Sequence, residues 1–290
     1  MADLLQFIVA GLKSGAIYAL VALGFTIVYA ATGAINFAQG EFYMVGGMVG
    51  FWLTDSGLPL PFAVVLAIIV TAAVGALFEW LAVRPIASGD PLRIIMVTIG
   101  GSVVIRQAAL HLFGGNERPL PPFTAGSSVR VLGAAIERQT LWVWGLTAVA
   151  VLALAFVYRR TPFGLAMRAT ALNRDAARLV GVNARTMVTA AFALAAALGA
   201  LGGLVVAPLT QTAFNVGAGM GVKGFACAIL GGLGNQVAAV GGGLILGLLE
   251  SLAAGYLDPL YKDAVALVVL LAVLFLRPQG LLGGKGREKV

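Results

Sequence analysis

Residues 161–183 read TPFGLAMRATALNRDAARLVGVN, the longest polar interval between two strongly apolar regions of the chain. Residues 159–185 contain six arginines and one acidic residue, Asp175. The alanine, leucine, arginine and methionine content favours helix, but no apolar run in the interval is long enough to cross a bilayer. A short basic helix between membrane segments is typical of a cytoplasmic loop, and Gly164 and Gly181 allow turns at its ends. An ordinary cytosolic connection would show the same features.

The composition predicts an integral membrane protein. Of the 290 residues, 60% are hydrophobic and 11% are charged, whereas a soluble domain carries about 25% charged residues. Apolar runs of about 20 residues rich in Leu, Ala and Val favour membrane helices over the strands of a barrel. We therefore expect an all-α, polytopic transmembrane helical bundle that forms a single domain over residues 1–290. Three glycine pairs at small-xxx-small spacing predict close helix packing: Gly46/Gly50, Gly199/Gly203 and Gly243/Gly247.

Hydropathy divides the chain into about eight membrane segments with interrupted or re-entrant helices. The apolar spans are expected at about 4–31, 42–53, 62–83, 94–113, 141–158, 186–208, 237–256 and 264–276. A further apolar segment, 224–233, is too short to cross comfortably. The chain has about nine spans if this segment crosses, and about seven plus a re-entrant hairpin if it does not.

The placement of Arg and Lys predicts the orientation of the bundle. Positive residues concentrate on the cytoplasmic side of membrane proteins, and residues 159–185, the loop 84–93 and the tail after residue 276 are all basic. Alternation of the spans puts these three segments on one side, and the N-terminus and the longest loop, 114–140, on the other. The net charge of +7 therefore reflects membrane topology, and we expect no nucleic-acid partner.

Polar residues interrupt the apolar pattern once in each half of the chain. Buried polar groups are costly in hydrocarbon, so such residues are expected to face a cavity or another helix. Paired broken segments are typical of transporters whose helix ends line a central path, although interfacial turns would give the same pattern. The translocation-path candidates are Asn36, Gln39, Glu41, Gln211 and Asn215.

Three charged residues lie inside or near the predicted spans: Glu79, Arg106 and Glu250. Because Glu79 and Arg106 lie on neighbouring spans, we expect them to form a structural ion pair. Glu79 also lies near enough to a membrane end for its side chain to reach the interface.

The sequence shows no arrangement typical of an enzyme. Gly219-x-Gly221-x-x-Gly224 has the spacing of a dinucleotide loop but follows no strand, and Gly284-Lys285 lacks the rest of a Walker A motif. The only histidine, His111, and the only cysteine, Cys227, cannot form a metal cluster or a disulfide within the chain. We therefore expect no cofactor, no metal and no catalytic residues.

Several motifs carry a resemblance to a known family. Residues 15–26, GAIYALVALGFT, and 36–41, NFAQGE, resemble the permeases of branched-chain amino acid ABC importers, and most closely the shorter, high-affinity-type subunit of the permease pair. AARL at 176–179 is similar to the cytoplasmic coupling segment of that family, and 231–234 and 276–281 are also similar. The resemblance covers essentially the whole chain. Gln39 departs from the family, since many relatives have His there, so proton-linked chemistry is not expected at this position.

The resemblance implies a multi-pass permease domain of the bacterial inner membrane without an ATPase of its own. The implied partners are a second, longer permease subunit, two cytosolic ATPase subunits, a periplasmic substrate-binding protein and membrane lipid. The coupling segment, about 159–185, would dock in a groove on the ATPase through the 176–179 face. The coupling candidates are Arg168, Arg174, Ala177, Arg178 and Gly181.

The expected cargo is a branched-chain or other hydrophobic amino acid. Urea and short amides stay open, because the matched motifs do not separate the amino-acid permeases from those relatives. An ion-coupled secondary transporter, a membrane-embedded enzyme and a passive channel are the alternatives from other classes.

Overall fold

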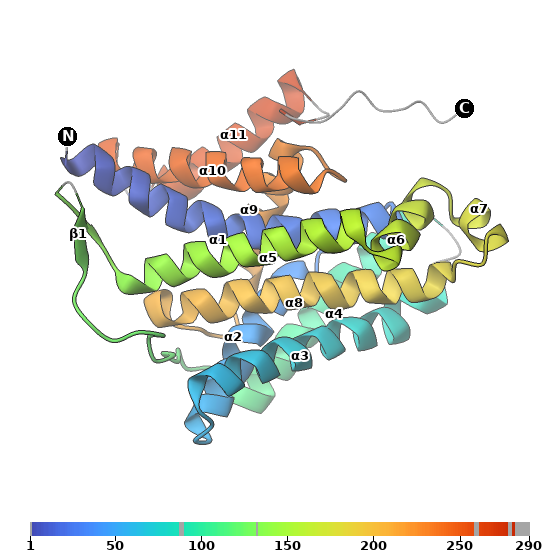
Figure 1. Ribbon diagram of the computed structural model, residues 1–290, viewed down its shortest axis with the longest axis horizontal. Coiled ribbons are helices and arrows are strands. Elements are labelled where there is room, and N and C mark those ends of the chain that lie inside the picture. The colour runs from blue at the N-terminus through green and yellow to red at the C-terminus, as the bar shows by residue number, and fades with distance from the viewer. Residues whose placement is uncertain (1, 87–89, 132, 258–260, 278–279, 282–290) are drawn as a thin grey trace.

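The computed structural model describes residues 2–86, 90–131, 133–257, 261–277 and 280–281. Its helices are α1 (Ala2–Thr32), α2 (Gln39–Asp55), α3 (Leu60–Phe78), α4 (Pro91–Phe113), α5 (Arg138–Arg160), α6 (Pro162–Leu172), α7 (Arg174–Leu179), α8 (Ala184–Thr210), α9 (Val216–Gly231), α10 (Gln236–Tyr256) and α11 (Lys262–Leu276). Helix α3 continues through a π-helical turn, η1 (Glu79–Val83), into a 3-10 turn, η2 (Arg84–Ile86). The predicted all-α helical bundle is confirmed, with long helices lying side by side in Figure 1.

Six helices in the described part of the chain are long and apolar enough to cross a membrane. They are Asp3–Thr32, Leu60–Ile86, Pro91–Phe113, Arg138–Arg160, Ala184–Thr210 and Gln236–Tyr256. Helices α2, α9 and α11 are shorter, with 17, 16 and 15 residues. The apolar segment expected at 224–233 is the second half of α9, which already begins at Val216.

Helix α1 is the centre of the bundle and packs against α10 and α8. Its residues 16–28 are buried almost without exception. Glycines allow the α1 and α10 backbones to touch, because a Cβ on Gly15 would lie 2.8 Å from Leu244 Cα. A Cβ on Gly243 would lie 2.7 Å from the backbone nitrogen of Ala19. Because lipid tails are as apolar as the helix surfaces, the hydrophobic effect does not drive helices together in a membrane, and close packing stabilises the bundle instead.

The other predicted glycine pairs also lie at helix contacts. Gly46 packs on Ala200, and Gly203 packs on the backbone of Tyr43, so that α2 and α8 approach closely. The packing role predicted for the small-xxx-small pairs is therefore confirmed.

The two ends of the bundle carry different secondary-structure elements. A β-hairpin, β1 (Val129–Val131) and β2 (Ala134–Ile136), lies at one end, and α6 and α7 lie at the other (Figure 1). The start of α1 lies at the hairpin end, where the Gln6 amide exchanges hydrogen bonds of 2.9 and 3.2 Å with the Ala135 backbone. The N-terminal helix and the longest loop therefore share one end, as alternation of the spans predicts. The hairpin within that loop was not predicted, because its strands are only three residues long.

The two basic loops meet at the opposite end. Arg84 lines the same cleft as Arg174, Arg178 and Arg185. The predicted sharing of one side by 84–93 and 159–185 therefore agrees with the structure. Of the basic tail, Lys285, Arg287 and Lys289 lie outside the described residues.

Candidate translocation path and coupling surface

Helix α2 begins deep inside the bundle instead of at its edge. The Gln39 Nε2 donates a 2.9 Å hydrogen bond to the carbonyl of Ala195, which lies near the middle of α8. The backbone nitrogen of Phe37 donates to Thr98 Oγ1 of α4 at 3.1 Å. Residues 33–38 therefore form an irregular segment at membrane depth, in which Ala34, Asn36 and Ala38 are buried and Gly33 and Phe37 are exposed. Such backbone is tolerated at this depth where it packs on protein or lines a cavity.

The start of α9 lies directly against the start of α2. A Cβ on Gly217 would lie 2.8 Å from the Gly40 carbonyl oxygen and 2.5 Å from Glu41 Oε2. Gly221, one turn further along α9, faces Gly40 in the same way. The interrupted segments of the two halves of the sequence thus meet through glycine backbone, and we call residues 36–41 and 216–221 the central junction.

Three polar side chains of the central junction are almost fully buried: Asn36, Gln39 and Glu41. Each has a buried atom without a hydrogen-bond partner among the described residues, namely Asn36 Nδ2, Gln39 Oε1 and Glu41 Oε2. The other polar side-chain atom of each residue does form a hydrogen bond. Asn36 Oδ1, for example, accepts from the Ala38 nitrogen at 3.1 Å. The junction therefore retains unused hydrogen-bonding capacity at membrane depth, which is costly unless a ligand, water or partner fills it.

Glu41 forms an ion pair with Arg106 of α4. The guanidinium donates to Glu41 Oε1 through Nε at 3.2 Å and through Nη2 at 2.5 Å. The carboxylate side chain is 1% exposed and the arginine side chain 28% exposed. A planar guanidinium that donates from two nitrogens fixes the position of the carboxylate as well as compensating its charge.

The predicted pairing of Glu79 with Arg106 is wrong. Glu79 lies in η1 and accepts a 2.6 Å hydrogen bond from Thr189 Oγ1 of α8. Arg106 lies 15 residues beyond the start of α4 at Pro91 (106 − 91 = 15), about 22 Å along the helix axis. Glu79 lies in η1, just before the loop that leads into α4, whereas Arg106 lies far along α4, so the two residues sit at different membrane depths.

The polar residues of the second interrupted segment lie away from the buried side chains of the junction. Gln211 and Asn215 are exposed, between the end of α8 and the start of α9. Gln211 has a φ of 62°, a left-handed conformation that is uncommon for a residue other than glycine. Next to it, Thr212 pairs with Arg118 through two backbone hydrogen bonds of 2.8 and 2.9 Å. The structure therefore brings together Asn36, Gln39 and Glu41, and leaves Gln211 and Asn215 outside their contacts.

Glu250 belongs to a second buried polar cluster, which the sequence did not predict. The Tyr18 hydroxyl donates to Glu250 at 2.6 Å, and Lys223 Nζ lies 3.3 Å from the same carboxylate. Lys223 also contacts Asp263 at 2.7 Å. The cluster joins α1, α9, α10 and α11, so that it ties the short helix α9 to the rest of the bundle.

Local signals in the sequence define α6 and α7 at the opposite end of the bundle from the hairpin. Thr161 caps α6 by accepting from the Gly164 nitrogen at 3.1 Å. Asn173 caps α7 by accepting from the nitrogens of Asp175 and Ala176, each at 3.0 Å. Gly181, with a φ of 84°, closes the turn after α7. Side-chain caps and a glycine in the left-handed region are standard helix boundaries.

The tip of this region exposes apolar side chains. Leu172, Leu179 and Val180 are 75%, 89% and 77% exposed. Exposed leucines beside arginines, outside the long apolar helices, are typical of a protein contact surface. We call residues 162–182 the coupling surface.

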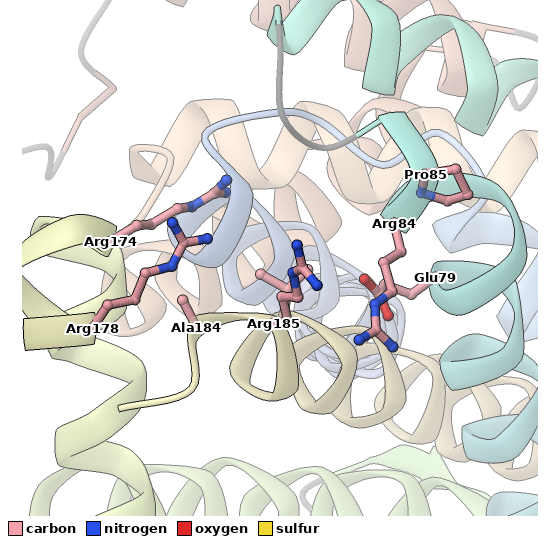
Figure 2. Close-up of a pocket in the computed structure, with 8 residues that line it drawn as sticks. Glu79, Arg84, Pro85, Arg174, Arg178, Ala184 and Arg185 are labelled. Atoms are coloured by element: carbon pink, nitrogen blue, oxygen red, sulfur yellow. The ribbon is translucent and has the colours of Figure 1, made fainter. Parts of the chain in front are cut away.

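A cleft of about 350 Å³ adjoins the coupling surface. Its lining residues are Glu79, Arg84, Pro85, Arg174, Arg178, Ala184, Arg185 and Val188. Figure 2 shows Arg174 and Arg178 on the α7 side, Arg185 on α8 and Arg84 on the far side of the cleft. Arg178 contacts Asp175 at 3.2 Å, and among the described residues Arg84, Arg174 and Arg185 form no salt bridge. The arginine cleft is thus strongly positive.

Arg174 lines the α7 side of the arginine cleft. Its Nη2 donates a 2.7 Å hydrogen bond to the Ala31 carbonyl near the end of α1. Partial burial, together with the nearby Arg178 guanidinium, lowers the pKa of Arg174. Arg174 therefore links α7 to the central helix α1.

The coupling candidates differ in accessibility. Arg168, Arg178 and Gly181 are exposed, and Arg174 is half-buried. Ala177 is 3% exposed and packs inside the chain, so it supports α7 and offers no surface to a partner. Arg84 and Arg185 were not among the predicted residues, although the basic character of both loops could have indicated them.

Comparison with known proteins gives a consistent result. Residues 7–274 match the family model described as branched-chain amino acid transport system / permease component. The chain is 34% identical to the high-affinity branched-chain amino acid transport system permease protein BraD of Pseudomonas aeruginosa, over 99% of this chain and 98% of BraD. It is 34% identical to LivH of Escherichia coli K12, a permease protein with the same description, over 99% of this chain and 97% of LivH. It is also 28% identical to LsrC of Shigella flexneri, an autoinducer 2 import system permease protein, over 90% of this chain and 76% of LsrC.

The family match covers nearly the whole helical bundle, including the central junction and the coupling surface, and the identity to two relatives extends over almost the full length of each. The chain therefore belongs to the family of branched-chain amino acid transport system permease components, as a multi-pass protein of the inner membrane.

Proposed function

We propose that the chain is the permease subunit of an ABC importer for branched-chain or other hydrophobic amino acids. ATP hydrolysis takes place on separate cytosolic subunits, and this chain forms part of the path without catalysing a reaction. The names of BraD and LivH support the class of cargo. A second, longer permease subunit, two ATPase subunits and a periplasmic binding protein complete the importer.

The observation that carries this proposal is the coupling surface with its arginine cleft. An ATPase docked there would contact the exposed Leu172, Leu179 and Val180, and its acidic side chains would meet the positive cleft. Arg174 and its bond to Ala31 give a mechanical link from α7 to α1. Movement of the ATPase would therefore reach α1, which packs on both α8 and α10.

The central junction is the proposed site of passage. Asn36, Gln39 and Glu41 carry unused polar atoms where two short helices begin, and Arg106 fixes Glu41 from α4. At the start of α2 the backbone nitrogens of Gln39 and Glu41 already donate to the carbonyls of Asn36 and Ala38. The unused side-chain atoms are therefore the groups that a polar ligand would meet. Closure or opening of this junction would follow from small shifts of α2 against α9, whose contact is made by glycine backbone.

The test is coupled ATP hydrolysis in a complex reconstituted into liposomes with its ATPases and binding protein. Arg178→Ala removes a charge from the arginine cleft. Gly181→Ala strains the turn by about 1–2 kcal/mol because of its positive φ, although the space around Gly181 is open. Both variants are expected to insert normally but to lose cargo-stimulated hydrolysis. Arg160→Ala, at a position outside the cleft, is the matched control for Arg178→Ala. Unchanged coupling in both test variants would oppose the proposal.

Two alternatives have distinct outcomes. A permease for urea or short amides would show uptake competed by those amides and not by leucine. A secondary transporter would retain uptake after ATP depletion and lose it when the ion gradient is collapsed.

A further inference from the structure

A groove follows α1 between α5 and α10. Its inner part, about 800 Å³, lies between α1, α5, α6 and the start of α10, and its outer part, about 480 Å³, lies between α1, α5 and α10. Val151 of α5 lines both parts, which therefore adjoin. From Trp144 in the outer part to Arg159 in the inner part, α5 advances 15 residues (159 − 144 = 15), about 22 Å.

The outer part of the groove is almost wholly apolar. Leu12 and Ala16 of α1, Leu152 of α5, and Val240 and Leu244 of α10 line it. Water gains little in such a space, since it finds few hydrogen-bond partners there. The chemistry of this part therefore fits hydrocarbon.

The inner end of the groove is polar and basic. Arg159 and Arg168 line it together with the amides Asn235 and Gln236. Among the described residues, neither arginine forms a salt bridge. Asn235 uses its Oδ1 to cap α10 by accepting from the Ala238 nitrogen at 3.2 Å, which leaves its amide nitrogen free to donate.

The basic end lies at the membrane surface on the side of α6 and α7. Arg159 is in the last turn of α5, and Arg168 is on α6, which begins two residues after α5 ends. The concentration of Arg and Lys places this end at the cytosol. At that level the headgroups of the cytoplasmic leaflet, which include anionic lipids, adjoin the protein.

We propose that this groove is a binding site for an anionic phospholipid of the cytoplasmic leaflet. One acyl chain lies along α1 between α5 and α10, and the phosphate is bound by Arg159 and Arg168, with amide hydrogen bonds from Asn235 or Gln236. Apolar lining at membrane depth and a pair of cations at headgroup depth match the two parts of such a lipid. A membrane helix of another subunit would fill the apolar part but would leave Arg159, which lies on α5 outside the coupling surface, without a counter-charge. This site does not depend on which solute the permease carries.

The test uses native mass spectrometry of the purified complex with added dioleoyl phosphatidylglycerol, dioleoyl phosphatidylcholine or glycerol phosphate. Wild type is expected to retain phosphatidylglycerol in preference to phosphatidylcholine and to ignore glycerol phosphate. Arg159→Gln and Arg168→Gln are each expected to weaken retention about fivefold, the factor that corresponds to ~1 kcal/mol per basic residue near an anionic leaflet. Arg160→Gln, which is exposed next to Arg159 but outside the groove, is expected to match wild type.

A second pair of variants tests the apolar part. Ala148→Phe adds a side chain inside the groove, whereas Ala153→Phe adds the same side chain at an exposed α5 position outside it. Only Ala148→Phe is expected to abolish lipid retention, with both variants eluting as folded complexes. Equal retention of the two lipids, equal loss in Arg159→Gln and Arg160→Gln, or full competition by glycerol phosphate would overturn the proposal. A spin label on Ala148→Cys reports through its collisions with oxygen dissolved in the lipid whether this position faces lipid. If a protein partner shields the label from oxygen in the complete complex, the proposal is overturned as well.

Discussion

Removal of Arg106 is expected to destabilise the bundle strongly, because it leaves the Glu41 carboxylate charged and buried. Breaking a buried ion pair by deleting one partner costs about 3–5 kcal/mol. The Arg106 side chain is 28% exposed, so water screens part of the pair and we take about 3 kcal/mol for Arg106→Met. In a chain of this size, 1 kcal/mol corresponds to a shift in the melting temperature of about 2–4 °C. The expected loss is therefore about 6–12 °C.

Removal of the Glu41 carboxylate is expected to cost less stability than removal of the Arg106 guanidinium. Glu41→Gln leaves a guanidinium that can turn toward water, so we expect about 1 kcal/mol. The double variant Glu41→Gln with Arg106→Met is expected to be about 2 kcal/mol more stable than the sum of the single effects predicts. Unfolding in detergent can be followed by the fluorescence of the four tryptophans. It gives the change in unfolding free energy for each single variant and for the double variant, which complete the double-mutant cycle.

A second cycle supplies the control. Glu79 is held by Thr189 and not by Arg106, so Glu79→Gln and Arg106→Met are expected to add within about 0.5 kcal/mol. Additive effects in the Glu41 cycle, or a large coupling in the Glu79 cycle, would refute the assignment of the ion pair at the central junction.

Three further outcomes are expected. Gly40→Ala forces a Cβ into the backbone of α9 and is expected to abolish uptake and lower the melting temperature. Gly219→Ala, where a Cβ meets open space, is the control and is expected to change the melting temperature by less than about 2 °C. Lys223→Met leaves the fully buried Glu250 without its nearest cation and is expected to cost about 3 kcal/mol in the same fluorescence assay. Leu179→Asp, at a position 89% exposed, is expected to leave the melting temperature of the isolated chain unchanged but to weaken ATPase binding at least tenfold in a pull-down titration.

Hydropathy and charge placement were sufficient to predict the helical bundle and the common side of the two basic loops. Those features follow from one-dimensional patterns, since an apolar run must cross the membrane and arginines stay on one side. The polar interruption at Asn36, Gln39 and Glu41 also predicted a break in the helices. The same pattern could not show that α9 begins against α2, because that contact depends on Gly40 and Gly217 from distant parts of the chain.

Pairing of charged residues was the least predictable feature. Neighbouring spans suggested Glu79 with Arg106, but the depth of each residue along antiparallel helices decides which charges meet. Lys223 reaches Glu250 only because α9 packs beside α10. The arginine cleft likewise depends on the folding of two loops onto one another, which places Arg84 close to α7.

Site-specific cross-linking at the tip of α7 tests the central claim most directly. The only native cysteine, Cys227, is buried, so Leu179→Cys provides a single accessible thiol in the native background. We expect Leu179→Cys to cross-link to the ATPase subunit in membranes and to resist a membrane-impermeant thiol reagent applied from outside the cell. Labelling from outside, or full ATP-driven uptake by a complex in which no ATPase contacts residue 179, would contradict the account.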